Sequence, residues 1–166
     1  PLLRTLQRAW PDTRFTWIIG RAEARLMSLL PEVEFITVDK RAGFSGLAAL
    51  RRHLQGRRFD LVMHLQLSLR ASLVAAVIPA QRKLGFDRAR AREGQWLFTD
   101  TKIAARQRQH VLDSFMEFAD ACGINEHVFE WNLPLPADAL NYAREWIPPI
   151  EETSAGTLVI SACSSH

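Results

Sequence analysis

Cysteine is scarce in this sequence. The two cysteines, Cys122 and Cys163, cannot form a disulfide framework, and Cys163 with His166 supplies only two of the four ligands of a structural zinc site. The chain also lacks the pattern of a secretory signal. These absences are typical of a protein from a reducing compartment, so we expect a cytoplasmic protein.

Long apolar runs are absent as well. The longest, Ala71 to Ala80, is interrupted by Ser72 and Pro79 and has about half of the ~20 residues that a membrane-spanning helix needs. The sequence therefore predicts no membrane-spanning segment.

The common enzyme signatures are missing too. The sequence contains no Gly-x-Gly-x-x-Gly fingerprint, no phosphate-binding Gly-Lys-Ser/Thr loop, no Gly-x-Ser-x-Gly elbow and no His-Glu-x-x-His helix. This argues against the usual dinucleotide and nucleotide enzymes, the serine hydrolases and the zinc proteases. We expect neither a cofactor nor a metal.

The charge that is present is concentrated in one place. Residues Arg82 to Arg92 hold five basic side chains and one acid, whereas the remaining 16 basic and 17 acidic residues, from totals of 21 and 18, nearly cancel. The sequence pI of about 9.3 therefore reflects a local feature. Such a pattern favours one anion-facing site over a surface that coats nucleic acid.

Short β-rich runs alternate with helical patterns along 166 residues that are 48% hydrophobic, enough for a globular domain with its own core. This alternation predicts an α/β fold with a Rossmann-like parallel sheet covered by helices on both faces. The expected strands are 15–19, 35–38, 60–65, 82–86 and 158–161. The expected helices are 21–30, 45–55, 69–78, 110–121 and 137–146.

The two ends suggest a division of the chain. It opens with a helix whose apolar face is Leu2, Leu3, Leu6 and Trp10, although a parallel α/β domain usually starts with a strand, so we expect a first strand upstream of Pro1. The predicted domain is 1–147, the predicted linker 148–156, and 157–166 the first strand and loop of a second domain.

Ligands of open parallel sheets bind beyond the carboxyl ends of the strands, where this sequence places several basic residues. Their convergence would create a site for carboxylates or phosphates, which arginine binds through its planar fork. The alternative is a set of solvated loop charges. The residues concerned are Lys40, Arg41, Arg70, Arg88 and Arg92.

Three further polar residues have two interpretations each. His64 lies in an apolar strand with Gln66 near its end, where a polar side chain is either hydrogen-bonded for structural reasons or in contact with a ligand. His110, at the start of a helix, either caps that helix or contacts a ligand.

Several segments together resemble the family 9 glycosyltransferases, the lipopolysaccharide heptosyltransferases. The resemblance covers nearly the whole chain and is carried by the order of Leu65-Gln66, Arg70-Ala-Ser72, Gly85-Phe86-Asp87 and Ala91-Arg92-Glu93, followed by the segments 109–124 and 158–166. It implies the N-terminal half of a GT-B architecture, in which two Rossmann-like domains face each other across a cleft.

The function that this resemblance implies is inverting, metal-independent transfer of heptose from ADP-heptose to the Kdo-containing inner core of a lipid A precursor, at the cytoplasmic face of the inner membrane. The implied acceptor-binding residues are Arg92, Arg88, Arg70, Gln66, Lys40, Arg41 and His110. Ser164 and Ser165 match the loop that touches the donor diphosphate. The family's catalytic base, an aspartate after the first strand, would lie upstream of Pro1, so we expect these 166 residues alone to be inactive.

The alternative hypothesis is a non-catalytic basic module that binds nucleic acid or an anionic membrane through Arg82 to Arg92. Only Phe86 and Trp96 flank the arginines, which alanines separate, so the aromatic interleaving typical of nucleic-acid binding is weak. We therefore expect no nucleic-acid partner.

Overall fold

The computed structural model describes residues 1–39, 41–107 and 109–147, and the chain divides into two compact units, Pro1–Asn132 and Leu133–His166. The predicted linker and final strand fall outside the described residues, and the predicted domain boundaries stay a prediction. The elements of the first unit are α1 Leu2–Ala9, β1 Phe15–Gly20, α2 Arg21–Met27, β2 Val33–Val38, α3 Gly43–His53, β3 Phe59–Met63, α4 Leu69–Val77, β4 Ala80–Gly85, the 3-10 helix η1 Gln95–Leu97, β5 Thr101–Lys102 and α5 Val111–Asp120.

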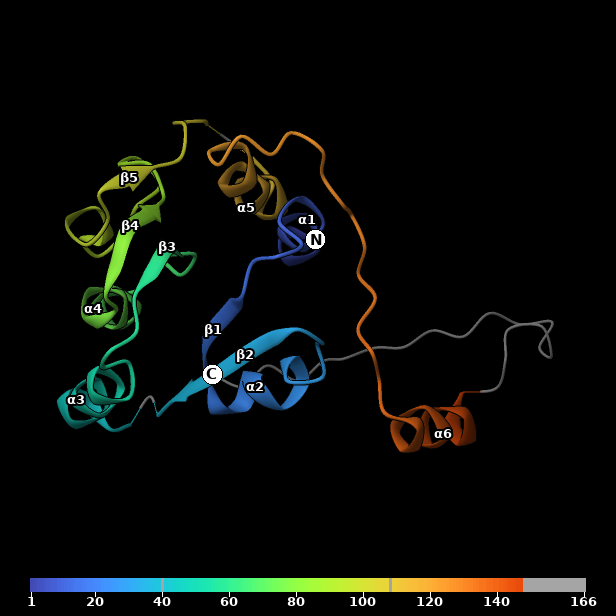
Figure 1. The fold of residues 1–166 in the computed structure, drawn as a ribbon. Helices are drawn as coiled ribbons and strands as arrows, with labels where there is room; N and C mark the ends of the chain where they lie inside the picture. The colour runs from blue at the N-terminus through green and yellow to red at the C-terminus, as the bar shows by residue number, and fades with distance from the viewer. Residues whose placement is uncertain (40, 108, 148–166) are drawn as a thin grey trace. The chain divides into compact units, whose positions relative to one another are not determined.

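The alternation of strands and helices is confirmed, and every strand pair is parallel (Figure 1). The prediction of a single sheet is not: β1 pairs with β2, and β3, β4 and β5 form a second sheet. In the described residues no ladder hydrogen bonds join β1 to β3. The short strand β5, which pairs with the end of β4, was not predicted because two residues show no periodicity.

A shared core nevertheless joins the two sheets. On one face, Ile36 and Ile18 of the first sheet pack with Val62 of the second, beneath Leu50 of α3 and Val74 of α4. Helices α3 and α4 lie beside each other on this face (Figure 1).

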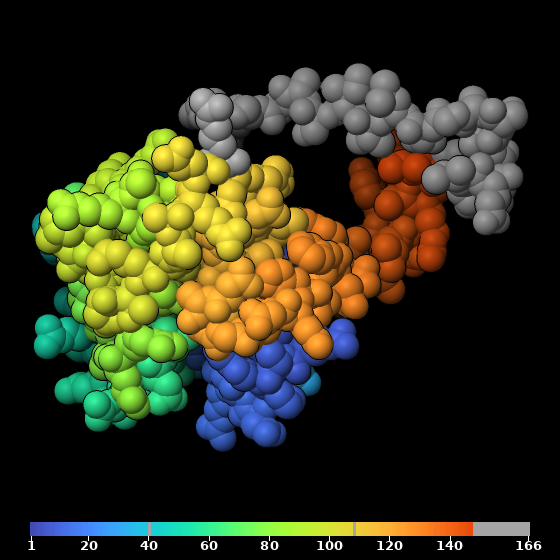
Figure 2. All heavy atoms as spheres, turned by 90° about the horizontal axis from the view of Figure 1, so that it is seen from above, coloured from blue at the N-terminus to red at the C-terminus, as the bar shows by residue number. Residues whose placement is uncertain are grey.

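The opposite face of the sheets is covered by α1 and α5. Along β3, Leu61 and Met63 pack into a cluster that includes Phe118 of α5, whereas the intervening Val62 packs on the other face. This alternation is the period of a strand, and it confirms the prediction of helices on both faces. In Figure 2 the yellow and orange atoms of this part of the first unit pack against each other.

Helices α1 and α5 pack side by side, as Figure 1 shows. Leu6 of α1 contacts the cluster around Ala119 of α5, so the predicted apolar face of the first helix is confirmed. In α5, Met116 and Ala119 are buried as expected, but Val111 is 64% exposed because it lies in the first turn, beyond the edge of the core.

Strand β4 is tied to α4 by a side chain as well as by packing. The Nζ of Lys83 donates to the carbonyl oxygens of Ala75 at 2.7 Å and Ala76 at 3.2 Å, in the last turn of α4. The last carbonyls of a helix have no partner within it, and a cation there also complements the helix dipole. Lys83 therefore serves as a cap for α4.

The second unit contains α6, Ala137–Trp146, at the predicted position. None of its residues is buried within that unit. In the part of the chain that the structure describes, no helix is both long and apolar enough to cross a bilayer.

Candidate functional site

The chain leaves β4 through a turn that is built around Asp87. Its Oδ1 accepts the N–H groups of Ala89 at 2.9 Å and of Arg90 at 3.3 Å, and its backbone carbonyl accepts the N–H of Ala91 at 2.8 Å. Aspartate favours such turns because its carboxylate can accept bonds from the backbone two and three residues later. The turn leaves the Arg88 side chain exposed to solvent.

The end of this loop is fastened to helix α4. Glu93 and Gly94 both have left-handed backbones, with φ of 49° and 73°, and the Glu93 carboxylate accepts the N–H of Leu69 at 2.5 Å. The first N–H groups of a helix lack partners within it and attract negative charge. This bond brings Arg92, the neighbour of Glu93, and Arg70, the neighbour of Leu69, to the same edge of the sheet.

A buried glutamine connects the ends of β3 and β4. Gln95 is 0% exposed; its Oε1 accepts the N–H of Phe86 at 3.3 Å, and its Nε2 donates to the carbonyls of His64 at 2.9 Å and Gln66 at 3.4 Å. The side chain of Gln95 therefore links the backbones of the segments that follow the two strands. The side chain of Gln66 itself is exposed at this edge.

Three exposed guanidinium groups lie beside these joined loops, two on the loop after β4 and one in the first turn of α4. Arg70, Arg88 and Arg92 are exposed, and none of them has an ion-pair partner among the described residues. The guanidinium carbon of Arg88 lies 4.8 Å from the centre of the Trp96 ring, a cation–π contact that holds this side chain against the loop. These groups are available to carboxylates and phosphates.

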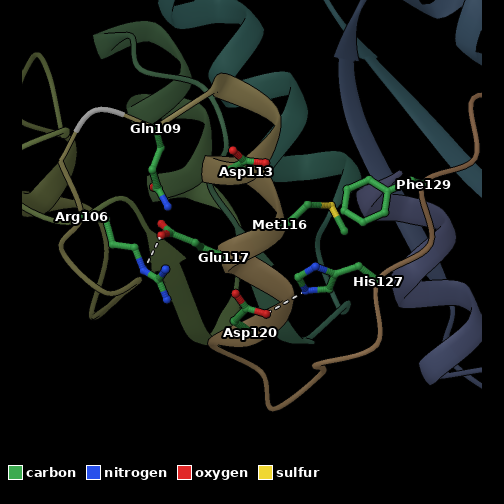
Figure 3. Close-up of a pocket in the computed structure, with 8 residues that line it drawn as sticks. All are labelled: Arg106, Gln109, Asp113, Met116, Glu117, Asp120, His127 and Phe129. Atoms are coloured by element: carbon green, nitrogen blue, oxygen red, sulfur yellow. Dashed lines mark hydrogen bonds and ion pairs between the residues drawn. The ribbon is translucent and has the colours of Figure 1, made fainter.

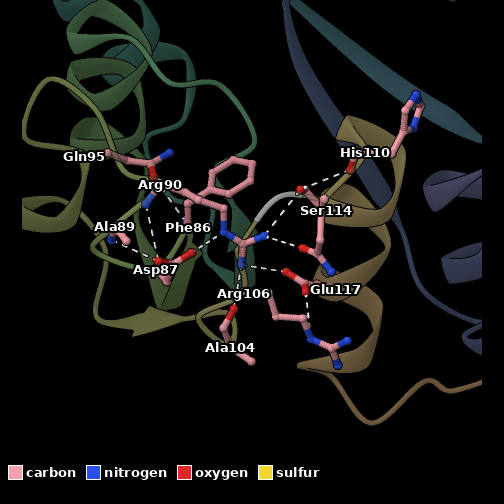
Figure 4. Close-up of polar contacts among 11 residues, drawn as sticks. Phe86, Asp87, Ala89, Arg90, Gln95, Ala104, Arg106, His110, Ser114 and Glu117 are labelled. Atoms are coloured by element: carbon pink, nitrogen blue, oxygen red, sulfur yellow. Dashed lines mark hydrogen bonds and ion pairs between the residues drawn. The ribbon is translucent and has the colours of Figure 1, made fainter.

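Arg90, between Arg88 and Arg92 in sequence, has a different environment (Figure 4). Its side chain is 18% exposed, its Nε donates to Asp87, and its Nη2 lies 2.7 Å from Oε2 of Glu117. Burial alone would lower the pKa of Arg90, but the hydrogen bonds to the two carboxylates raise it above its usual range. Burial likewise opposes ionisation of Asp87, yet the bonds from Arg90 and Ala89 hold its pKa below its ordinary value.

The surroundings of His64 agree with the structural interpretation of this residue rather than with ligand contact. It is 4% exposed, and its Nε2 lies 3.0 Å from Oγ of Ser72, whose hydroxyl in turn donates to the carbonyl of Ser68 at 3.1 Å. Burial lowers the pKa of His64 to about 4, so the ring is neutral at pH 7.

The other predicted site residues are not brought to this edge by any contact within the described residues. Arg41 is exposed after β2 in the other sheet, and its N–H donates to Oδ1 of Asp39 at 2.8 Å. His110 caps α5, where its Nδ1 accepts the N–H of Leu112 at 3.2 Å, so one of its two proposed roles is confirmed. Lys40, Ser164 and Ser165 lie outside the described residues.

A hollow of about 260 Å³ lies beside α5 (Figure 3). It was not predicted, and none of the predicted site residues lines it. Its polar lining is largely paired, because Arg106 lies 3.1 Å from Glu117 and His127 lies 2.7 Å from Asp120. Within the described ranges, no group of three or more His, Cys, Asp or Glu side chains is arranged to hold a metal ion.

Comparison with known proteins identifies the family. The model of glycosyltransferase family 9, the heptosyltransferases, matches residues 47–166. The chain is also 36% identical, over 164 residues and 99% of its length, to the lipopolysaccharide core heptosyltransferase OpsX of Haemophilus influenzae. The chain belongs to glycosyltransferase family 9.

A second relative, lipopolysaccharide heptosyltransferase 3 of Escherichia coli, is 21% identical over 132 residues, which are 76% of this chain. The chain spans 46% of the length of the first relative and 38% of the second. The identity of the family agrees with the glycosyltransferase hypothesis, and the comparisons give no support to the non-catalytic basic module.

Solved family 9 structures have the same fold. Escherichia coli heptosyltransferase WaaC with ADP-2-deoxy-2-fluoro heptose aligns with a TM-score of 0.69 and 24% identity over 83% of this chain and 50% of that one. The family 9 glycosyltransferase of Veillonella parvula aligns with a TM-score of 0.73 and 22% identity, over 88% of this chain and 43% of that one. The predicted fold, the Rossmann-like half of a GT-B enzyme, is confirmed.

The sequence did not reveal the residues that shape the site. Gln95 reads as an ordinary polar loop residue, and Glu93 and Trp96 gave no sign of their partners. The one available signal was the spacing of Asp87 and Arg90, which allows an aspartate that starts a turn to pair with a cation three residues later.

Proposed function

We propose that this chain provides the acceptor-binding side of an inverting, metal-independent heptosyltransferase that uses ADP-heptose and acts on the Kdo-containing inner core of lipopolysaccharide. The proposal is supported by the 36% identity to a lipopolysaccharide core heptosyltransferase along almost the entire chain. It is also supported by the fold of WaaC, which was solved with an ADP-heptose analogue.

The observation that carries the acceptor assignment is the edge formed by the loops after β3 and β4. The Glu93–Leu69 bond and the buried Gln95 hold these loops together, and Arg88 and Arg92 on the loop after β4 and Arg70 in the first turn of α4 are exposed. A Kdo-containing acceptor presents carboxylates and phosphates, which pair with guanidinium groups in a bidentate manner. Gln66 adds a neutral polar group at the same edge.

Peripheral residues complete the proposed site. Lys40, Arg41 and His110 are proposed as further acceptor contacts, and Ser164 and Ser165 as contacts of the donor diphosphate. The reaction requires a base to take the proton of the acceptor hydroxyl, while positive groups stabilise the departing ADP. None of the described residues is assigned the role of that base.

The acceptor chemistry also suggests where the enzyme acts. A lipid-linked acceptor is presented at a membrane surface, so we place the enzyme at the cytoplasmic face of the inner membrane as a peripheral protein. Its contact with the bilayer would be electrostatic, through the exposed arginines, and would weaken with salt.

The direct test is Arg92→Ala in the natural full-length protein. We expect KM for the Kdo-containing acceptor to rise at least about tenfold, because a charge-assisted contact is lost, with KM for ADP-heptose unchanged. Arg51→Ala is the matched control, since Arg51 is exposed on α3 and away from the proposed edge. Steady-state kinetics with each substrate varied in turn measure both values.

An unchanged acceptor KM in Arg92→Ala would contradict the acceptor assignment. Salt-sensitive, sequence-tolerant binding of oligonucleotides, lost equally in Arg88→Ala and Arg92→Ala, would instead support the basic-module alternative.

A further inference from the structure

The Arg90 guanidinium makes four hydrogen bonds and one close ion pair with other groups of the protein. A guanidinium carries five N–H donors in a fixed planar fork, and here five acceptors surround it. They are Asp87 Oδ2 for Nε, Gln109 Oε1 (2.9 Å) and Ser114 Oγ (3.4 Å) for Nη1, and the Ala104 carbonyl (2.6 Å) and Glu117 Oε2 (2.7 Å) for Nη2. All three nitrogens of the guanidinium are therefore in contact with acceptors of the protein.

These acceptors come from three separate segments of the first unit (Figure 4). Asp87 belongs to the turn after β4, Ala104 follows β5, and the remaining three acceptors lie on α5 or just before it. The aromatic ring of Phe86 lies 5.9 Å from the guanidinium carbon, and that ring packs edge-on against Phe118 of α5 at 5.0 Å. Arg90 therefore links the turn to the helix through both polar and apolar contacts.

Of the two arginines that reach Glu117, Arg90 contributes more to the link between the turn and α5 than Arg106 does. Both carboxylate oxygens of Glu117 are buried, and among the described residues only two guanidinium groups reach them. The second, Arg106, is 60% exposed and approaches to 3.1 Å. Solvent weakens such an exposed pair, so the buried charge of Glu117 is compensated mainly by Arg90.

We propose that Arg90 is a positioning residue, which clamps the turn after β4 to α5 so that the neighbouring Arg88 and Arg92 are held ready for an anionic acceptor. This inference rests on the proposed function. The Asp87 turn is short, so freeing it from α5 would let both flanking arginines move. Preorganisation of binding groups reduces the ordering that a ligand must otherwise impose.

The test compares Glu117→Gln, Arg90→Lys and the double variant in the natural full-length protein, with Arg51→Ala as control. Glu117 is remote in sequence from the loop, and its replacement by glutamine is isosteric. We expect each single variant to raise KM for the Kdo-containing acceptor several-fold to roughly tenfold, with KM for ADP-heptose unchanged. The double variant should be no worse than Arg90→Lys alone, because both changes break the same link.

A directly binding Arg90 would behave in the opposite way. Arg90→Lys would keep the charge and most of the affinity, and Glu117→Gln would leave acceptor KM unchanged or lower it by releasing the guanidinium. Either pattern overturns the proposal.

Amide hydrogen exchange provides a second readout that is independent of activity. In Arg90→Lys and in the milder Ser114→Ala, the amides of Ala89 and Ala91 should exchange several-fold faster, while those of β1 and β2 are unchanged. Unaltered exchange in the loop of a folded Arg90→Lys protein overturns the clamp. If the loop loosens but Arg92→Ala leaves acceptor KM unchanged, the clamp stands and the proposed function fails.

Discussion

The region from β1 to α3 and the region from β3 to α5 are built from similar strand and helix units, but they differ in how many polar side chains they bury. Six of the seven buried polar or charged side chains of the described residues lie between His64 and Glu117, and the seventh is Thr5. Glu34 of β2, in the first region, has its ionic contact at the surface: it pairs with Arg57, in the segment between α3 and β3, and the side chains of Arg57 and Glu34 are 34% and 47% exposed.

The region from β3 to α5 therefore depends more on buried hydrogen bonds than the region from β1 to α3 does. A buried polar group destabilises a fold unless its hydrogen bonds are made, so each such group fixes the geometry around it. Between β3 and α5 these groups connect loops, since Gln95 bonds to the ends of two strands and Arg90 connects a turn to α5. The Arg57–Glu34 pair, by contrast, lies at the surface, where Arg57 also donates to Thr16 of β1 and lies over the ring of Phe59 of β3.

The largest effect should come from Gln95→Leu. This substitution keeps the volume of the side chain but leaves the N–H of Phe86 and the carbonyl of His64 without their partner in a buried place. We expect the free energy of unfolding to fall by about 3 kcal/mol or more, measured by urea denaturation. A loss below about 1 kcal/mol would contradict the view that this polar contact holds the second region together.

A smaller effect should follow from acidification, through His64. The pKa of His64 is lowered by burial to about 4 in the folded protein, whereas the ordinary value is 6.5, so the unfolded chain binds more protons between these values. Stability is therefore complete above about pH 6.5 and is lost as the pH falls toward 4, with a loss of roughly 2 kcal/mol at about pH 5.

The variant His64→Leu isolates this contribution from that of the carboxylates. Ser72 still donates its hydroxyl proton to Ser68 in the variant, so no buried donor is left without a partner. Urea denaturation at about pH 7 and pH 5 should show a shallower pH dependence for the variant than for the parent chain. Parallel curves would mean that His64 does not titrate in this window.

The smallest effect belongs to the surface pair of Glu34 and Arg57. Hydrogen bonds from Arg57 and Thr16 lower the pKa of Glu34 to about 2, so any stabilisation is present above about pH 4.5 and disappears as the pH falls toward 2. Solvent screens a pair that is this exposed, so Arg57→Gln should change the free energy of unfolding by less than about 1 kcal/mol at pH 7. A larger loss would remove the contrast between the two regions.

The elements of regular structure could be predicted because they follow from periodicity. The strands β1 to β4 and the helices α3 to α6 were placed within two residues at each end, whereas α2 ends three residues before its predicted end. The apolar faces of α1 and most of α5 were correct. Strand β5 and the division of the sheet into two parts could not be predicted, because they depend on which segments meet in space.

The sequence pointed only to the exposed residues of the candidate site, whose role stays a prediction. Arg70 and Arg92 were expected at one edge and do lie beside the two residues of the Glu93–Leu69 bond. Arg88 and Arg90, however, are chemically equal members of one cluster in the sequence, and only the acceptors contributed by Ala104 and α5 distinguish them. The environment of a charge, which is set by long-range packing, is not encoded in its neighbours.

Because Lys83 is engaged in capping α4, the basic segment Arg82 to Arg92 is expected to attract fewer mobile counterions than its five cations suggest. Two of the five cations between Arg82 and Arg92, Lys83 and Arg90, are bound to the protein's own oxygens. Only the other three can attract small anions that an incoming ligand would displace. If this segment binds the proposed acceptor, a titration of that binding against salt should report fewer displaced ions than the composition of the segment implies.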